Sequence, residues 1–189
     1  MPTENWLAER SRKFALLRGK RVESWAGVEM AFREDVAGIG PQFEDPEVPC
    51  LQLWGLLASL DDGSTFTVSS YQDGVNFGLC SDQKHTHEKL QDEGLWDGIY
   101  RLRRLTELPT GRVDQVTVYV DAVDSVLAEV HLQIGQRPIL LVAGELDETW
   151  GGELVFSRLD ESVLVFNDLA AVEQTPWSTS RQGLAPSHC

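Results

Sequence analysis

The run from Val126 to Ile134 constrains the fold more than any other feature of this sequence. From Ala128 onward apolar residues take every second position, and Glu129, His131 and Gln133 stand between them. Because successive side chains of a strand point to opposite faces, this spacing predicts a half-buried strand whose polar face meets water. A helix over the same residues would scatter the apolar set around its circumference.

Two Asp-Gly pairs add a local connectivity to this pattern. Asp62-Gly63 and Asp73-Gly74 separate apolar or alternating runs, and Gly supplies the positive φ that a tight hairpin turn needs. Three successive strands over 50–80 are therefore expected to form a meander. We also expect residues 139–143, apolar on both faces, to form a central strand, and 81–94 to hold a helical turn or two. Further strands are expected at 22–32, 113–120, 154–156 and 163–166, with 95–108 part strand and part loop.

One convincing helix precedes the strands. Residues 3–18 begin at a capping Thr3, carry a partial apolar stripe and stop at Gly19. The sequence thus predicts a single α+β domain over 1–172, an antiparallel meander with an N-terminal helix. Residues 173–189 have little apolar pattern and are expected to be a loose tail.

The chain is acidic, with a formal net charge of -14 and a pI near 4.6. Such a surface repels phosphate backbones and argues against nucleic-acid binding, whereas it suits solubility and a basic protein partner. Residues 1–21 are basic, with six basic and two acidic side chains, and we expect a solvated helix face there. Three irregularly spaced cysteines and no long apolar run indicate a reducing, cytoplasmic location and no membrane association.

Two segments combine carboxylates with Gly or Pro and follow strong strand patterns. Residues 33–49 are expected to form an exposed acidic loop, and a second such segment follows 139–143. Among the tryptophans, Trp25 and Trp54 are expected in the core, whereas Trp96, Trp150 and Trp177 are expected to be partly exposed. The predicted partner-binding residues are Glu34, Asp35, Glu44, Asp45 and Glu47, followed by Asp147, Glu148 and the apolar anchor Trp150.

No catalytic signature is recognisable. His85 and His87, two positions apart, are the main candidates for metal ligands, but the remainder of a ligand set is missing, so no metal and no cofactor is predicted. The G-x-S-x-G, Walker and G-x-G-x-x-G motifs are absent, and Cys50 lies in an apolar run where thiols are usually inert. The expectation is that the protein is not an enzyme.

Three stretches resemble small bacterial immunity proteins, the antidotes of polymorphic and contact-delivered toxins. They are RPILLVAGE over 137–145, DESVLVF over 160–166, and the hairpin around the DG turn within 51–79 that ends in FGL. The resemblance implies a cytoplasmic protein that neutralises a toxin by direct binding. It carries over no functional residues, since such proteins bind through surfaces that differ from pair to pair.

Three readings of function follow. The first is a non-catalytic binding protein that binds a basic protein partner through acidic loops. Its more specific version is an immunity protein that binds a toxin effector. The second is a metal-dependent enzyme or small-ligand binder using His85 and His87. The third is a regulatory or structural module that self-associates through an edge strand into a homo-oligomer.

Overall fold

The computed structural model describes residues 4–84 and 94–187. Over these ranges it is mostly antiparallel sheet with a short N-terminal helix, as predicted, and no helix there has the length and apolar character to cross a membrane. The elements are α1 (Glu4–Ala15), β1 (Arg21–Met30), β2 (Leu51–Leu60), β3 (Thr65–Asp73), β4 (Asn76–Lys84), β5 (Gly94–Asp97), β6 (Tyr100–Arg104), β7 (Gly111–Asp121), β8 (Val126–Ile134), β9 (Arg137–Glu148), β10 (Leu154–Phe166), α2 (Leu169–Gln174) and β11 (Leu184–Pro186).

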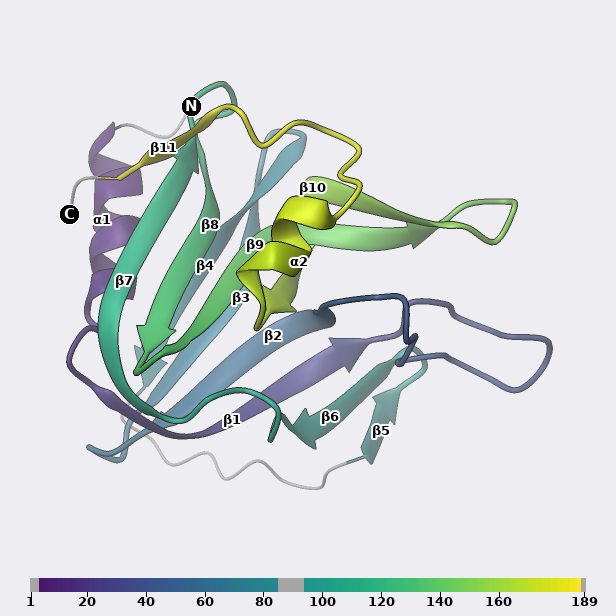
Figure 1. Cartoon of the computed structure of the whole chain (residues 1–189), viewed down its shortest axis with the longest axis horizontal. Coiled ribbons are helices and arrows are strands. Elements are labelled where there is room, and N and C mark those ends of the chain that lie inside the picture. The colour runs from purple at the N-terminus through teal and green to yellow at the C-terminus, as the bar shows by residue number, and fades with distance from the viewer. Residues whose placement is uncertain (1–3, 85–93, 188–189) are drawn as a thin grey trace.

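Strands β1 and β2 pair with each other and are shared by two parts of the sheet (Figure 1). The outer edge of β2 is divided: residues 51–53 pair with β10, and residues 56–59 pair with β3. The outer edge of β1 is divided as well, with residues 21–22 on β7 and 26–30 on β6. The pairings β2-β10-β9-β8-β7-β1 therefore close on themselves, while β3-β4 and β6-β5 branch away.

The close approach inside this arrangement requires glycine at position 27. A Cβ on Gly27 would lie 2.9 Å from Leu105 Cδ1 and 3.1 Å from Leu53 Cδ2, two side chains of the main core. A larger residue would push either the leucines or β1 out of place. Gly63 has a φ of 78° in the β2–β3 turn, which is the conformation expected from the Asp-Gly pair.

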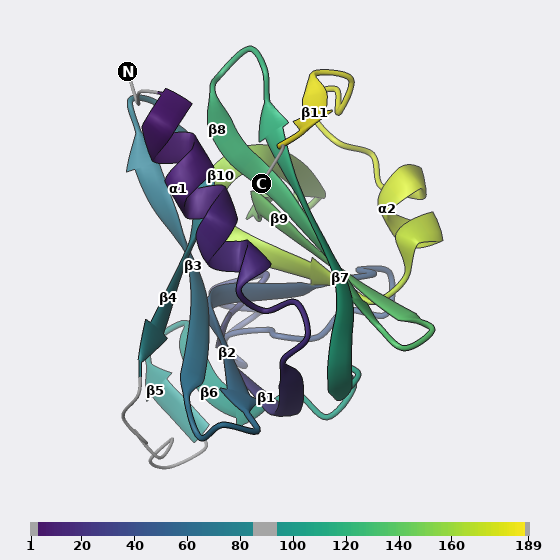
Figure 2. The same cartoon turned by 90° about the vertical axis from the view of Figure 1, so that its left-hand side faces the viewer.

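The core lies on both faces of β9. Residues 139–143 are fully buried, which confirms the prediction of a central strand. On one face Leu141 and Ala143 belong to the main hydrophobic cluster. Helix α1 contributes Phe14 to the same cluster (Figure 2). On the other face Leu140 and Val142 pack in a second cluster with residues of β10, α2 and the following segment.

The meander over 50–80 is confirmed, since β2, β3 and β4 pair in sequence order. The helix is shorter than expected: it ends at Ala15, and turns carry the chain to Gly19, which has a φ of 83°. For 81–94 the predicted helical turn is wrong up to Lys84, because β4 continues that far. Residues 85–93 lie outside the described part of the chain.

Two further expectations are corrected. The runs 154–156 and 163–166 belong to one strand, β10, which bulges between Arg158 and Val163, with Leu159 at a φ of 58°. A bulge breaks the alternation on which the sequence pattern depends. Trp54 is 47% exposed rather than buried: a shift in the β1–β2 register leaves it without a partner residue on β1, and its ring packs edge-on against Tyr100.

Two predictions are wrong. Glu129 does not lie on a solvent-exposed face of β8, and the described residues 173–187 do not form a loose tail. Glu129 is fully buried, and both its carboxylate oxygens accept hydrogen bonds of 2.8 Å from Arg181. Burial raises the pKa of Glu129, but Arg181 and His131 outweigh it, so that the pKa lies below its usual value. Trp177 also packs against Phe156, and β11 pairs with β7.

Replacing Arg181 by Met should destabilise the fold. The change removes both hydrogen bonds and leaves the Glu129 carboxylate buried, so we expect the free energy of unfolding to fall by about 3 kcal/mol. The double change Glu129→Gln with Arg181→Met should recover at least half of the loss. Urea unfolding measures both. Arg12→Met on the exposed face of α1 is the control, and a loss for Arg181→Met no larger than the control's contradicts the ion pair's role.

Candidate functional site

The two acidic segments predicted from the sequence lie together at one end of the molecule. Figure 1 shows the loop between β1 and β2 and the tip of the β9–β10 hairpin projecting at the end opposite α1. We call residues 31–50 and 145–161, taken together, the acidic end. Residues 31–50 contain five carboxylates and one arginine, and residues 145–161 contain six carboxylates and one arginine.

Arg33 joins the two segments. Its Nη1 lies 2.9 Å from Asp45 Oδ2, and its Nε lies 3.2 Å from Glu148 Oε1. The same guanidinium donates a 3.4 Å hydrogen bond to the Gly152 carbonyl in the hairpin tip. One internal cation therefore holds a loop and a hairpin that lie more than a hundred residues apart in the sequence.

Three of the predicted loop acids have structural partners. Asp45 accepts from the Glu47 amide and from Arg33, and these two hydrogen bonds lower the pKa of Asp45. Asp35 accepts from the amides of Gly38 and Gly40 and so closes a turn, which accounts for an aspartate at this position. Glu44 is mostly exposed and pairs with Arg101 at 3.1 Å.

Glu34 and Glu47 are exposed and make no ion pair with any residue that the structure describes. In the hairpin, Asp147 accepts a 3.0 Å hydrogen bond from Ser157, while Glu148 belongs to the Arg33 cluster. Trp150 is fully exposed at the tip. The structure thus places all eight predicted residues at the acidic end, and three of them, Glu34, Glu47 and Trp150, are exposed with no ion pair to a described residue.

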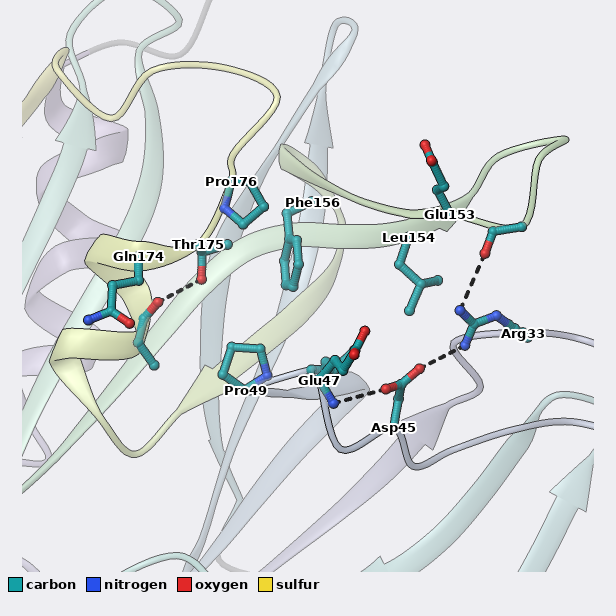
Figure 3. Close-up of a pocket in the computed structure, with 13 residues that line it drawn as sticks. Arg33, Asp45, Glu47, Pro49, Glu153, Leu154, Phe156, Gln174, Thr175 and Pro176 are labelled. Carbon is teal, nitrogen blue, oxygen red and sulfur yellow. Dashed lines mark hydrogen bonds and ion pairs between the residues drawn. The ribbon is translucent and has the colours of Figure 1, made fainter.

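A groove opens between the loop, β10 and α2, with a volume of about 620 Å³ (Figure 3). Its apolar lining includes Pro49, Leu154 and Phe156, and Glu47 and Asp45 stand on one side. Figure 3 shows the Glu47 carboxylate directed toward the side of Leu154 and Phe156, whereas the Glu153 carboxylate points away. We call this the Phe156 groove.

A second cavity, of about 530 Å³, is also lined by Arg33 and includes several acidic side chains. Glu34, Asp35, Asp147 and Glu148 all contribute to it, so residues of both segments face one space. Glu161 and Glu145 complete the acidic lining.

Glu145 was not among the residues selected from the sequence. Burial is the main cause that raises the pKa of Glu145, to about 7, and the charges of Asp147, Asp160 and Glu161 add to it. Ser162 Oγ donates a weak 3.4 Å hydrogen bond to its carboxylate. The available signal was one carboxylate at the end of the apolar run of β9.

Among the described residues no group of three histidine, cysteine or acidic side chains is placed to hold a metal ion. The His85 and His87 prediction lies outside the described residues. Cys50 is buried, and burial raises the pKa of its thiol far above the usual range.

A second group of charged residues, on β1 and β6, lies beside the loop 31–50. Glu29 on β1 is almost inaccessible and pairs with two arginines of β6, Arg101 at 2.5 Å and Arg103 at 2.8 Å. Arg101 also pairs with Glu44, so this cluster ties the loop to the sheet. The sequence had indicated only alternation in this region.

Replacing Glu145 by Gln should change how stability depends on pH. The window lies between pH 4.5, the ordinary pKa of a glutamate side chain, and about pH 7, the raised pKa of Glu145. In this window the folded protein keeps a proton that the unfolded chain has released, so the free energy of unfolding falls as pH rises. We expect the wild type to lose on the order of 1 to 2 kcal/mol relative to Glu145→Gln between about pH 5 and 8. Urea unfolding at both pH values, with Glu34→Gln as control, measures it. Equal pH dependence of wild type and Glu145→Gln contradicts the raised pKa.

Comparison with known proteins adds no relative to these observations: no protein-family model, no curated protein and no solved structure matches the chain. The function proposed below accordingly rests on the residues, distances and charges of the acidic end.

Proposed function

We propose that this protein is a non-catalytic binding protein that engages the basic face of a protein partner through its acidic end. The observation that carries the proposal is the meeting of two acidic segments around a single internal cation, Arg33. Arg33 neutralises part of Asp45 and Glu148 only, so the end keeps a large excess of negative charge. Such an excess raises the local concentration of a basic partner and speeds its association.

The exposed Trp150 supplies what charge alone does not. Exposed charges contribute mainly to the association rate, whereas a large aromatic side chain that becomes buried slows dissociation. Trp150 stands at the hairpin tip beside the acids, and Arg33 holds the backbone carbonyl of Gly152 in the same tip. This weak bond and the Arg33–Glu148 ion pair restrain the base of the tip, which reduces the entropic cost of association on this proposal.

A toxin effector is the partner that we would test first. The stretches 137–145 and 160–166 resemble immunity proteins, and both belong to the hairpin strands that end at the acidic end. On this proposal the protein acts in the cytoplasm by covering the toxin's active site, with no turnover of its own.

Self-association is a second proposal with one observation in its favour. Exposed basic residues of the N-terminal segment, Arg12, Lys13 and Arg18, lie at the end of the molecule opposite the acidic end (Figure 1). A second copy could place this helix against the acidic end in a head-to-tail contact. Sedimentation of the purified chain over a range of protein concentrations, at low and high salt, separates the two proposals. Only self-association makes the apparent mass rise with concentration.

Neutralising the unpaired acids should slow partner binding. We expect the triple change Glu34→Gln, Glu47→Gln and Glu153→Gln to reduce the association rate about tenfold at low salt, with little change in dissociation and a smaller effect at high salt. The partner is first captured from a cell extract by the tagged full chain, and its association is then measured by surface plasmon resonance.

The matched control is the triple change Glu9→Gln, Glu23→Gln and Asp82→Asn, which alters the net charge equally at exposed positions outside the acidic end. A rate that falls equally for both triples would show that only the overall charge matters. A rate unaffected by either triple, or catalytic turnover by the purified chain, would rule out the proposal.

A further inference from the structure

We infer that the Phe156 groove receives an arginine or lysine side chain of the partner, with the aliphatic stem on Leu154 and Phe156 and the charged head at Glu47. The inference rests on the proposed function and extends it to a defined contact. Its basis is the combination of an apolar floor with the Glu47 carboxylate, which makes no ion pair with a described residue and is directed toward that floor (Figure 3).

The shape and lining of the groove suit a long side chain. Its volume of about 620 Å³ exceeds that of a single side chain and leaves room for the neighbouring backbone of the partner. The apolar surface is supplied by Val48, Pro49, Leu154, Phe156, Ala171 and Pro176. Arginine and lysine bury a hydrocarbon stem along such surfaces while their charged ends remain at the rim.

The charges at the rim select a cation. Asp45 is already paired with Arg33, whereas Glu47 is exposed, makes no ion pair with a described residue and points toward the apolar floor (Figure 3). A purely apolar side chain would cover the Glu47 carboxylate without replacing its water, which costs free energy. An acidic side chain would meet the unpaired Glu47 carboxylate and be repelled.

The groove is also held in shape before any partner arrives. The Asp45 carboxylate accepts from the Glu47 amide at 2.9 Å, which fixes the turn that carries Glu47. On the opposite side Phe156 packs against Trp177, and the Ser178 amide donates to the Phe156 carbonyl. Thr175 donates to the Ala171 carbonyl and steadies the end of α2.

The contact can be tested without knowing the partner. The probe is N-acetyl-arginine amide, titrated into the ¹⁵N-labelled full chain and followed by NMR, with N-acetyl-citrulline amide as its neutral isostere. We expect shifts centred on residues 47–49, 154–156 and 171–175, with a dissociation constant on the order of millimolar for one isolated side chain. The citrulline probe should bind about tenfold more weakly, because it lacks the charge.

Matched variants locate the head and the stem. Glu47→Gln should weaken the arginine probe about tenfold, whereas Glu34→Gln, in the same loop but outside the groove, should leave it unchanged. Leu154→Ala, at a half-buried position, should weaken both probes alike. Absence of shifts at the groove, equal binding of the two probes, or equal effects of Glu47→Gln and Glu34→Gln would each overturn the inference.

The experiments distinguish failure of the groove contact from failure of the proposed function. A partner whose binding needs the acidic end but is unaffected by Glu47→Gln leaves the proposed function standing and refutes the groove contact. Selective probe binding, together with no basic protein partner, supports a cation-binding groove and refutes the proposed function.

Discussion

The division of the outer edges of β1 and β2 is the constraint on which the rest of the structure depends. Each strand gives one part of its edge to the closed ring and another part to a branch, so neither can slide without breaking pairs in both. Gly27 permits the close packing at this point. The loop 31–50 joins these two strands and is thus anchored at both ends, and this anchoring lets a long irregular segment hold a defined shape.

The acidic end gathers charge at a cost to the folded state. Like charges at close range oppose folding, and the raised pKa of Glu145 registers this field, added to its burial, at one carboxylate. Arg33 offsets the repulsion only where loop and hairpin meet. Glu34 and Glu47 are exposed and make no ion pair with a described residue, which on the proposed function leaves both carboxylates free to contact a basic partner.

Local patterns in the sequence predicted the strands, the hairpin turns and the exposed acidic loop, because alternation and Asp-Gly pairs act over a few residues. What they missed depends on contacts between distant residues. Glu129 resembles a surface residue until Arg181, 52 positions later, covers it. Trp54 resembles a core residue, but the register shift between β1 and β2 leaves it without a partner residue on β1, and its side chain is 47% exposed. The candidate site follows the same pattern: the sequence predicted two separate acidic segments, but their meeting at Arg33 depends on the sheet topology.

The acidic end also separates two tasks that binding requires. Exposed carboxylates act at long range and in any orientation, so they bring a basic surface near but specify little. Trp150 and the Phe156 groove act only on contact and require a matching shape, which is the property that discriminates between partners. Arg33 contacts the hairpin tip and also lines the groove, so on the proposed function a contact at Trp150 and a contact in the groove would be linked through the same side chain. Discrimination among basic proteins would therefore depend on the spacing between these two contacts, which the Arg33 cluster fixes, rather than on the number of acidic residues.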